Sequence, residues 1–546
     1  MLYEFMKIKT IIILLLIIII TATVRLWALG QVPSSPDWDE ASLGYSAYSI
    51  LHTGKDEYGE FLPFVLRSFD DYKPALYVYL IVPFIVLLDL NIVAVRLPSA
   101  LFGIIFIIAV FFLVKELFKK DSIALLSSFL LAISPWHIQF SRIAFESNVG
   151  LSLNILWVLF FLKGLKRHWL LIPAAFIAGL NIYVYQSDKV FTPLLVLAAM
   201  FIYRKKLFSL PKKYLLTAFT IGIIVVLPMI IYTLTNENAL ARQKGVSVFN
   251  SDTTDLSESS KKVLIDRQNN DLIGLVFDNR RVQFARSIIF GYISHFDFNW
   301  LFIKGDEARH HAPGMGLMYL WELPFLLVGL YVLIFGNVDR KSKFLIFSWF
   351  LITPIPASVT GGVPHSVRTL NFLPTFQVFT AFGIIAFLNL SKTWRFKKFW
   401  ISILAIVVLI SFVYYSNQYF VQQNYFNSKD WQYGYKEAVS FVKKNQSDYD
   451  KIIVSNKAPL DQSYIFFLFY LKYPPVLYQK EASYASGGFR ENHQFGKYQF
   501  GPIDFNSQEN GKFLYVGRPD DFPPGTPTTV KIDYLNGSPA ILIVKK

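Results

Sequence analysis

The sequence predicts an all-α, multi-pass membrane domain followed by a C-terminal α/β domain that lies outside the membrane. Of the 546 residues, 53% are hydrophobic and only 17% are charged, whereas soluble domains carry about 25% charged residues. The charged residues gather between long apolar runs, which is typical of a polytopic membrane protein. After about Ser416 the composition changes to a soluble pattern. We therefore expect a transmembrane domain over residues 1–417 and a soluble domain over residues 418–546.

Apolar stretches of spanning length recur through the transmembrane domain. A helix that crosses a bilayer needs about 20 apolar residues, and the first stretch, residues 8–29, is too long for a signal-peptide core. The others lie at about residues 95–114, 122–140, 149–165, 168–185, 190–203, 213–234, 316–336, 343–359, 369–389 and 398–417. We expect these eleven spans, within a total of about 11 to 13 transmembrane helices.

Basic residues predict the orientation of the chain in the membrane. Lys7 and Lys9 flank the start of the first span, and later basic clusters occupy alternate loops. The positive-inside rule then makes the N-terminus cytoplasmic. The loops at residues 30–94 and 235–315 and the C-terminal domain are external, in a multi-pass protein of the plasma membrane. The net charge of +15 is therefore largely an orientation signal, and we predict no nucleic-acid partner.

One apolar stretch, residues 75–90, does not fit as a span. Its two ends must lie on the same side of the membrane, because a crossing there would move every later basic loop outside. It is also short, at about 16 residues, and contains Pro83. We expect a helix at the outer face that keeps Lys73 and Arg96 on the same surface as Asp39. The aromatic stretch 284–300 predicts a second interfacial helix.

The loop after the first span is rich in carboxylates. Most of them are expected to be solvated, but Asp39 and Glu40 lie within about two helical turns of the bilayer edge. A carboxylate there can reach a substrate whose tail lies in the lipid, and ionisable groups at this level are functional candidates. The outward-facing candidates are Asp39, Glu40, Lys73, Arg96, Arg142, Glu146, Tyr185, His365 and Arg368.

The sequence lacks the motifs of several kinds of chemistry. The chain has no cysteine, which excludes disulfides, thiolate metal sites and a cysteine nucleophile. We find no P-loop, no dinucleotide-binding glycine motif, no internal repeat and no His/Asp cluster at metal-ligand spacing. We therefore assign no metal ligand and no firm cofactor, and leave a divalent metal as an open alternative.

The outward-facing candidate residues suit glycosyl transfer from a sugar that is carried on a lipid phosphate. Departure of the lipid phosphate builds negative charge on its oxygens, which nearby cations stabilise. Lys73 and Arg368 are assigned to this phosphate, with Arg96 and His365 as further phosphate-binding candidates.

The acceptor side of the reaction needs a base. The acceptor hydroxyl loses its proton as it attacks the anomeric carbon, and a positioned carboxylate can take that proton. Asp39 is assigned to this role, with Glu40 and Glu146 as further catalytic candidates. One carboxylate suits a single inverting displacement, since no glycosyl-enzyme intermediate is then required. Arg142 and Tyr185 are assigned to the acceptor or the sugar.

Some of these residues also have a purely structural alternative. Arg96 can anchor a helix end by extending its head group to the interface. Arg142 and Glu146, four residues apart, can form a local ion pair. His365 can lie at the interface without a role, and Tyr185 can belong to the aromatic belt.

Four short motifs occur in a characteristic order. They are Asp39-Glu40, Lys73-Pro74-Ala75-Leu76, Arg96-Leu97-Pro98-Ser99-Ala100-Leu101, and Ser134-Pro135 with Arg142 and Glu146. Together they resemble the GT-C-fold, polyprenyl-phosphate-sugar-dependent glycosyltransferases of the protein mannosyltransferase and aminoarabinose transferase type (glycosyltransferase family 39). The resemblance covers residues 1–240 well and the part from Arg368 onward loosely.

The resemblance implies roles for several residues. Asp39 would be the catalytic carboxylate, and Lys73, with an arginine such as Arg368, would grip the lipid phosphate. The second external loop would supply an acidic residue, where this chain has Glu146 in place of the usual aspartate. Tyr72 precedes Lys73 where the family carries a carboxylate, which argues against a metal of the family type there.

Other functional classes compete with this interpretation. A transporter or flippase of lipid-linked glycans predicts inverted repeats and charges near the bilayer midplane, whereas these charges lie at the outer edge. A non-catalytic envelope assembly protein is a second alternative, and a polysaccharide polymerase or ligase would share the donor. The expected partners are membrane lipid, a polyprenyl-phosphate-linked sugar, and a protein, lipid or glycan acceptor.

The soluble region predicts a small α/β domain of about 125 residues. We expect helices at residues 435–444 and 463–471 and strands at residues 451–455, 476–479, 512–517, 530–535 and 540–544. Asn536-Gly537 between the last two strands is a hairpin signal. Acceptor recognition is our hypothesis for this domain.

Overall fold

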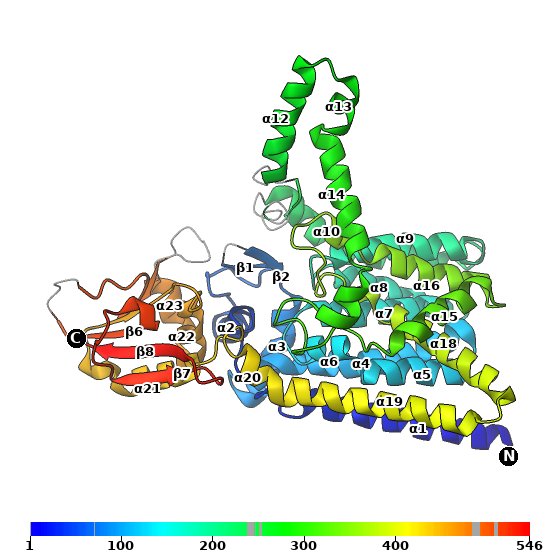
Figure 1. The fold of residues 1–546 in the computed structure, drawn as a ribbon, viewed down its shortest axis with the longest axis horizontal. Coiled ribbons are helices and arrows are strands. Elements are labelled where there is room, and N and C mark those ends of the chain that lie inside the picture. The colour runs from blue at the N-terminus through cyan, green and yellow to red at the C-terminus, as the bar shows by residue number, and fades with distance from the viewer. Residues whose placement is uncertain are drawn as a thin grey trace.

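The computed structural model contains a helical bundle with a smaller sheet-containing domain at one end (Figure 1). It describes residues 2–69, 71–236, 245, 247–249, 254–482, 492–506 and 511–546. The N-terminus lies at the end of the bundle that is far from the sheet domain (Figure 1). The predicted fold class, a helical membrane domain followed by an α/β domain, is confirmed.

The bundle is built from helices that follow the predicted spans. They are α1 (Leu2–Leu26), α4 (Ile92–Phe118), α5 (Asp121–Ala132), α6 (Pro135–Ser141), α7 (Ser147–Gly164), α8 (Leu171–Asn181), α9 (Asp188–Leu207), α10 (Lys212–Thr235), α15 (Glu322–Phe335), α16 (Arg340–Ile352), α17 (Ile355–Ser358), α18 (Thr375–Leu390) and α19 (Lys397–Asn417). Among the described residues, six helices are long and apolar enough to cross a membrane, or seven if α5 and α6, bent by 61°, form one span. The chain is a multi-pass membrane protein.

Helices α15 and α18 are packed tightly enough to require glycine. Helices α15 and α18 approach so closely that a Cβ added at Gly329 would lie 1.7 Å from the carbonyl oxygen of Phe379. A Cβ at Gly383 would lie 1.9 Å from the carbonyl oxygen of Phe325. Small residues that let backbones approach are typical of helix contacts within membranes. This contact fixes the C-terminal helices of the bundle against one another.

The loop after α1 folds into a compact unit at the end of the bundle next to the sheet domain (Figure 1). It contains α2 (Trp38–Thr53), the antiparallel strands β1 (Val65–Ser68) and β2 (Asp71–Pro74), and α3 (Leu76–Leu88). With 13 residues, α3 is shorter than the length that a span requires. Helix α2 packs against α3 and α4 on the membrane side and against α22 (Ser463–Leu471) of the sheet domain. This helix therefore lies where the two domains meet (Figure 1).

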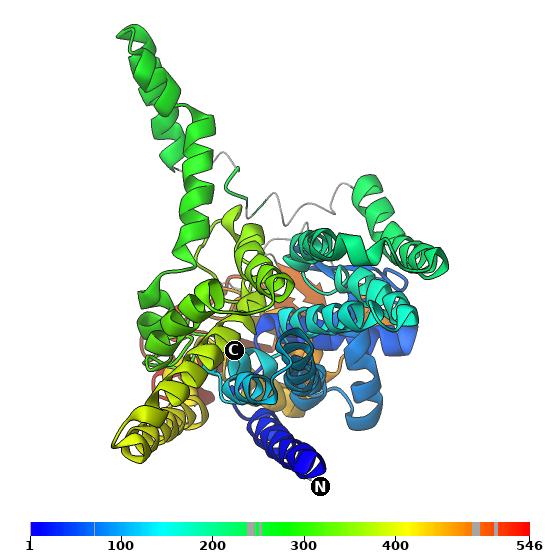
Figure 2. The ribbon, with the colours of Figure 1, turned by 90° about the vertical axis from the view of Figure 1, so that its right-hand side faces the viewer.

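A helical hairpin extends away from the bundle. It consists of α12 (Thr254–Gln268), α13 (Leu272–Phe277) and α14 (Arg280–Ser294), and it projects to one side of the spans (Figures 1 and 2). The predicted helix at 284–300 corresponds to the second half of α14, which ends at Ser294 because the chain then bends toward residues 300–304. The interfacial position of this stretch stays a prediction.

The sheet domain has six strands in the order β4-β5-β3-β6-β8-β7. The strands are β3 (Lys451–Val454), β4 (His493–Phe495), β5 (Tyr498–Phe500), β6 (Phe513–Gly517), β7 (Val530–Asp533) and β8 (Pro539–Lys545), with helices α21 (Tyr435–Asn445), α22 and α23 (Pro475–Glu481). The predicted β7–β8 hairpin is confirmed. The strand predicted at 476–479 is wrong, because Pro475 takes the first position of α23, where its fixed backbone angle favours a helix.

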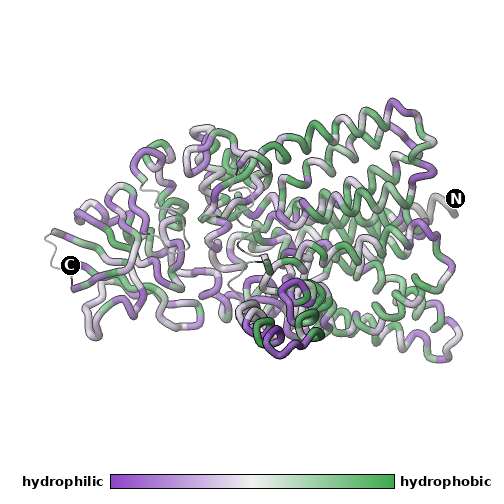
Figure 3. The backbone as a smooth tube through the Cα atoms, turned by 90° about the horizontal axis from the view of Figure 1, so that it is seen from above, coloured by the Kyte–Doolittle hydropathy of each residue, from purple (hydrophilic) through white to green (hydrophobic). Residues whose placement is uncertain are grey.

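A continuous helical segment joins the two domains. After α19 the helix continues through residues 418–422 and α20 (Gln423–Asn427), so the soluble fold begins beyond the boundary expected at 417. Hydrophobic residues dominate the bundle and hydrophilic residues are more frequent in the sheet domain (Figure 3). The composition change near Ser416 thus marks the end of the apolar helix, not the first residue of the soluble fold.

Candidate active site

Asp39 and Lys73 form an ion pair at the end of the bundle next to the sheet domain. Asp39 lies in the first turn of α2, and Lys73 lies on β2, where it pairs with Leu66 of β1. The Nζ atom of Lys73 donates a hydrogen bond to Oδ1 of Asp39. The side chain of Asp39 is 29% exposed and that of Lys73 is 9% exposed. A group that reaches Asp39 from solvent or lipid therefore meets a carboxylate and an ammonium together.

Glu40 and Arg96 form a second ion pair that is completely buried. The Nε and Nη2 atoms of Arg96 donate to the two carboxylate oxygens of Glu40 at 2.8 and 2.7 Å. The other three donors of Arg96 bind backbone carbonyls in the segment 29–35. Because a guanidinium has five N–H donors, none is left for a ligand. Glu40 also accepts the backbone N–H of Ala144 at 2.9 Å.

The start of α2 is held by a second set of contacts. The carboxylate of Asp37 caps the helix by accepting the backbone N–H of Glu40 at 2.8 Å, and its other oxygen accepts from Arg309 at 2.8 Å. The guanidinium of Arg309 also lies over the ring of Trp38, 4.6 Å from its centre. The backbone N–H of Trp38 donates to Gln432 of the sheet domain at 3.0 Å. The turn that presents Asp39 is therefore fixed from three sides.

Two carboxylates of the acidic loop, Asp56 and Glu57, are buried, so the expectation of a solvated loop is wrong for them. Burial raises the pKa of Glu57 well above its ordinary value, against the positive charge of Lys73. Burial also raises the pKa of Asp56 to about 6, although this carboxylate accepts two backbone N–H groups. Asp70, in the same loop, lies outside the described residues. The acidic loop therefore carries buried carboxyl groups close to the strand of Lys73.

Arg142 is buried and binds helix ends. Its Nη1 and Nη2 atoms donate to four backbone carbonyls in the segment 24–32, at the C-terminal end of α1. Arg25 does the same for α5, by donating to the carbonyls of residues 131 and 132. Cations stabilise the negative end of a helix dipole. The alternative of a local Arg142–Glu146 ion pair is therefore wrong, because the guanidinium points to α1. Glu146 itself is buried, directly before α7.

His365 belongs to a cluster that the sequence did not predict. Asp306, His310 and His365 each offer one metal-ligand atom, and these atoms lie within 4.8 Å of one another. The expectation that no His/Asp cluster has metal-ligand spacing is therefore wrong. The spacing of Asp306 and His310, which lie four residues apart, was the signal in the sequence that could have indicated this cluster. Arg368 follows in the same loop and donates to Thr360 at 2.6 Å and to the carbonyl of residue 361 at 2.7 Å.

Burial and neighbouring groups shift the pKa values of two residues of this cluster. Burial and the positive charge of Arg368 hold the pKa of His365 well below its ordinary value. Burial would raise the pKa of Asp306, but the hydrogen bonds from His310 and Ser366 outweigh it and hold that pKa below its ordinary range. The cluster is therefore an anionic carboxylate beside imidazoles.

The segment that carries Tyr185 lies against β2. The backbone carbonyl of Tyr183 accepts the N–H of Leu76 at 3.0 Å, and the side chain of Gln186 donates to the carbonyl of Tyr72 at 2.7 Å. Tyr185 is 9% exposed. The segment 183–186 is thus brought next to the strand that carries Lys73.

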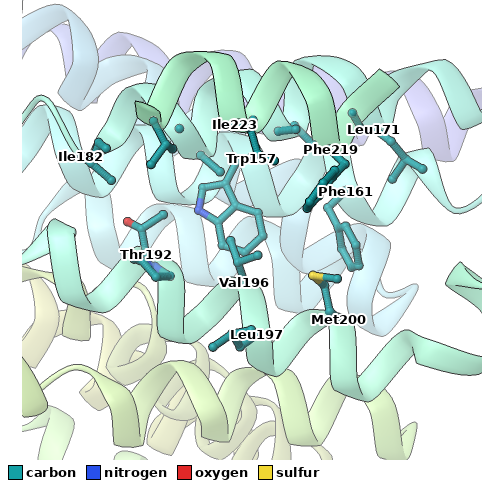
Figure 4. A pocket seen from close by; sticks show the side chains of 18 of the residues that line it. Trp157, Phe161, Leu171, Ile182, Thr192, Val196, Leu197, Met200, Phe219 and Ile223 are labelled. Carbon is teal, nitrogen blue, oxygen red and sulfur yellow. The ribbon is translucent and has the colours of Figure 1, made fainter. Parts of the chain in front are cut away.

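An apolar cavity opens between α7, α8, α9 and α10 (Figure 4). Its volume is about 600 Å³, and its walls include Trp157, Phe161, Leu197 and Phe219. Ile182 lines one end of it, next to Tyr183 and hence next to the backbone contact with Leu76 after β2. The cavity therefore runs from the apolar part of the bundle toward the strand of Lys73.

Comparisons with known proteins agree with this architecture. Residues 72–232 match the family model of dolichyl-phosphate-mannose-protein mannosyltransferases. No curated protein matches the chain. The structure of ArnT from Cupriavidus metallidurans bound to undecaprenyl phosphate is similar, with a TM-score of 0.55 at 11% identity, over 98% of this chain and 97% of that one. ArnT in the apo state gives a TM-score of 0.53 at 10% identity, over 100% of this chain and 98% of that one.

A second enzyme has a similar fold over part of its length. The oligosaccharyltransferase AglB from Archaeoglobus fulgidus, in complex with an inhibitory peptide and a dolichol-phosphate, gives a TM-score of 0.53 at 12% identity. The match covers 85% of this chain but only 64% of AglB, so this chain spans less than two thirds of that protein. The fold and the family-model match confirm the predicted resemblance to the GT-C glycosyltransferases.

Proposed function

We propose that this protein transfers a sugar from a polyprenyl-phosphate donor to an acceptor at the extracytoplasmic face of the plasma membrane. The observation that carries the proposal is the Asp39–Lys73 ion pair at the outer end of the bundle. It combines the two groups that the reaction needs, a base for the acceptor and a cation for the departing phosphate. The cytoplasmic N-terminus and the external C-terminal domain follow from the positive-inside rule.

In this mechanism the donor interacts with Lys73 and the acceptor interacts with Asp39. When the lipid-linked phosphate arrives, Lys73 donates a charge-assisted hydrogen bond to it. Asp39 then accepts the proton of the acceptor hydroxyl. The acceptor oxygen attacks the anomeric carbon as the bond from that carbon to the phosphate oxygen breaks. The proton goes to Asp39, the bonding electrons leave with the polyprenyl phosphate, and the single displacement inverts the anomeric centre.

Asp39, not Glu40, is the base in this mechanism. The oxygens of Glu40 are completely buried and already accept from Arg96 and from Ala144. The side chain of Asp39 is partly exposed and lies beside the ammonium that is assigned to the donor phosphate. We assign Glu40 and Arg96 to positioning: they hold the first turn of α2 against the end of α1 and thereby orient Asp39.

The cavity between α7 and α10 is the proposed site for the polyprenyl chain. It is lined almost entirely by apolar side chains, with Thr192 as an exception, and it is large enough for several isoprene groups (Figure 4). Burial of apolar chain there is favourable at about 25 cal/mol per Å². A chain in this position would bring its phosphate toward Lys73. Arg368 is the further phosphate-binding candidate at the outer face.

The acceptor side is formed by the external segments and the sheet domain. Helix α22 packs on α2, and Gln432 binds the backbone of Trp38, so a molecule held by the sheet domain lies near Asp39. Tyr185 and Glu146 are the candidates for sugar or acceptor contacts. Arg142 acts on the end of α1 instead, since its Nη donors bind backbone carbonyls. The acceptor is a protein, a lipid or a glycan.

The test is transfer of label from a panel of polyprenyl-phosphate sugars in membranes that contain the protein. Wild type is compared with Asp39→Asn and with Asp89→Asn, which removes the carboxylate of an exposed Asp–Lys pair, Asp89–Lys472. We expect one donor to be consumed by wild type and by Asp89→Asn but not by Asp39→Asn. Equal consumption by Asp39→Asn would refute the catalytic assignment, and the labelled product identifies the acceptor.

A further inference from the structure

We propose that Asp306, His310 and His365 bind a divalent transition-metal ion of the Zn²⁺ class. Asp306 and His310 come from the loop before α15, and His365 comes from the loop after α17. One ligand atom from each residue lies within 4.8 Å of the other two. A single ion between them would join two external loops that are far apart in the sequence.

The donor set is the one that such an ion prefers. Two imidazole nitrogens and one carboxylate oxygen are the protein ligands of many three-ligand zinc sites. Imidazole also selects Zn²⁺ over Mg²⁺, which prefers oxygen ligands. Since the chain contains no cysteine, histidine is the strongest transition-metal ligand that it can offer. The three ligands come from loops other than that of Tyr72, the position where the resemblance would place a metal-binding carboxylate.

Oδ1 of Asp306 and Nδ1 of His365 are available for an ion, whereas Nδ1 of His310 contacts Oδ2 of Asp306 at 3.2 Å. The hydrogen bonds that the described residues give to Asp306 all end on Oδ2. The Nδ1 atom of His365 is buried and has no hydrogen-bond partner in the described part of the chain. A buried polar atom without a partner is costly, by about 1 to 3 kcal/mol. Metal binding would remove that penalty.

The surroundings of the cluster orient its ligands. The backbone N–H and the hydroxyl of Ser366 donate to Asp306, and the backbone N–H of His365 donates to Nε2 of His295 at 3.2 Å. The rings of Phe140 and Phe145 lie 5.9 and 5.8 Å from that of His310. Hydrogen bonds to ligating groups and an apolar shell are the usual support of a metal site. A plain Asp–His ion pair would not require the third residue, His365.

The ion would hold two cations of the outer face in place. Arg309 lies between Asp306 and His310 in sequence and binds Asp37, the residue that caps α2. Arg368 lies one turn after His365. We therefore infer a structural role for the ion: it fixes the two loops that carry Arg309 and Arg368 against the turn that presents Asp39.

The test measures metal content, so it does not depend on the proposed activity. The full-length protein, purified without a histidine tag, is stripped with a chelator, incubated with ZnCl₂ and passed through gel filtration. Zinc per chain is then measured by mass spectrometry. His365→Gln and Asp306→Asn remove a ligand, and Asp306→Asn keeps an oxygen that accepts from Ser366. His311→Gln is the matched control, because His311 is adjacent to His310 but outside the cluster.

We expect about one Zn²⁺ per chain in wild type and in His311→Gln. Loss of one ligand is expected to weaken binding by more than about 100-fold, since even outer-shell changes weaken metal sites by about 10- to 100-fold. Zinc should also raise the Tm of wild type but not of His365→Gln. The proposal fails if wild type retains no zinc, or if both ligand variants retain as much as wild type. Loss of zinc from His311→Gln, or equal competition by Mg²⁺, would overturn the assigned ligands.

Discussion

Arg309 and Asp37 form an ion pair of 2.8 Å that joins the loop before α15 to the capping residue of α2. The carboxylate of Asp37 is completely buried, and the side chain of Arg309 is 18% exposed. Asp37 also completes the capping box with Glu40, which binds Arg96. A series of charged contacts thus runs from the loop before α15, through the first turn of α2, to α4. Asp39 lies on that turn.

Removal of the cation from this pair should destabilise the protein. Arg309→Met leaves the carboxylate of Asp37 buried without its counter-charge, which we expect to lower the free energy of unfolding by about 3 kcal/mol. Thermal melts in detergent measure the effect.

The matched control is the double variant Asp37→Asn/Arg309→Met. The asparagine still caps α2 but has no charge to compensate, so the double variant should be more stable than Arg309→Met alone. Additive losses of stability would mean that the two residues do not interact.

We expect Arg96→Lys to destabilise the protein as much as a non-conservative substitution would. Lysine cannot reproduce the bidentate contact with Glu40 or the carbonyl contacts in the segment 29–35. We expect a loss of about 3 kcal/mol or more in stability, measured by thermal unfolding. A lysine variant that unfolds at the wild-type temperature would contradict the positioning role of Arg96.

The lysine of the central pair should control donor affinity. We expect Lys73→Ala to weaken donor binding by about 10- to 100-fold, because one charge-assisted hydrogen bond contributes about 1.5 to 3 kcal/mol. Binding of a labelled polyprenyl-phosphate sugar measures this directly. Lys472→Ala, from the exposed pair with Asp89, is the control and should bind the donor as wild type does. Unchanged affinity in Lys73→Ala would assign the phosphate to other cations.

The apolar cavity predicts selection by lipid length. A Cβ at Gly222 would have its nearest neighbour at 3.8 Å, so a large side chain there would extend into the cavity. We expect Gly222→Phe to raise the KM for long-chain donors at least about tenfold while short-chain donors keep their KM.

Ile224→Phe on the exposed face of α10 is the control for this change, since Ile224 is 59% exposed and does not line the cavity. Equal effects of Gly222→Phe on long and short donors would place the lipid chain elsewhere.

Asp56 predicts a pH dependence of stability. Its pKa is raised to about 6 from an ordinary value of 3.8 because the carboxyl is buried. The folded state therefore binds the proton more tightly, so the contribution to stability is complete below about pH 4 and is lost between about pH 4 and 6. Asp56→Asn keeps the acceptor oxygen without the charge. Relative to wild type it should gain up to about 3 kcal/mol between about pH 4 and 7.

Thermal melts across this pH range test the prediction. Asp89→Asn is the control, because the pKa of Asp89 is shifted in the opposite direction: the hydrogen bond from Lys472 lowers it. A stability difference between Asp56→Asn and wild type that is constant with pH would contradict the assigned cause.

Much of the fold follows from local patterns in the sequence. Apolar length predicts a helix at each span, and the alternation of basic loops predicts that residues 75–90 do not cross the membrane, which agrees with the 13-residue length of α3. The hairpin at Asn536-Gly537 has a local turn signal and forms as expected. The strand expected at 476–479 is wrong because an apolar run that short fits a helix equally well, and Pro475 decides between them.

The candidate site was only partly predictable. Asp39 and Lys73 could be named because they lie close in sequence within the loop after the first span. The structural use of Arg96 and Arg142 could not, because it depends on which carbonyls the tertiary fold brings to their guanidinium groups. The Asp306–His310 spacing is a local signal, but His365 lies in another loop and only the fold places it beside them.

The most direct test of the account is the rate of sugar transfer in a single turnover with Asp39→Asn. The variant is given the donor identified with wild type, at a concentration that saturates binding. The account predicts donor affinity like that of wild type and a transfer rate lower by about 10²- to 10⁴-fold, the usual contribution of a general base. A transfer rate equal to that of wild type at full donor occupancy would show that Asp39 is not the base.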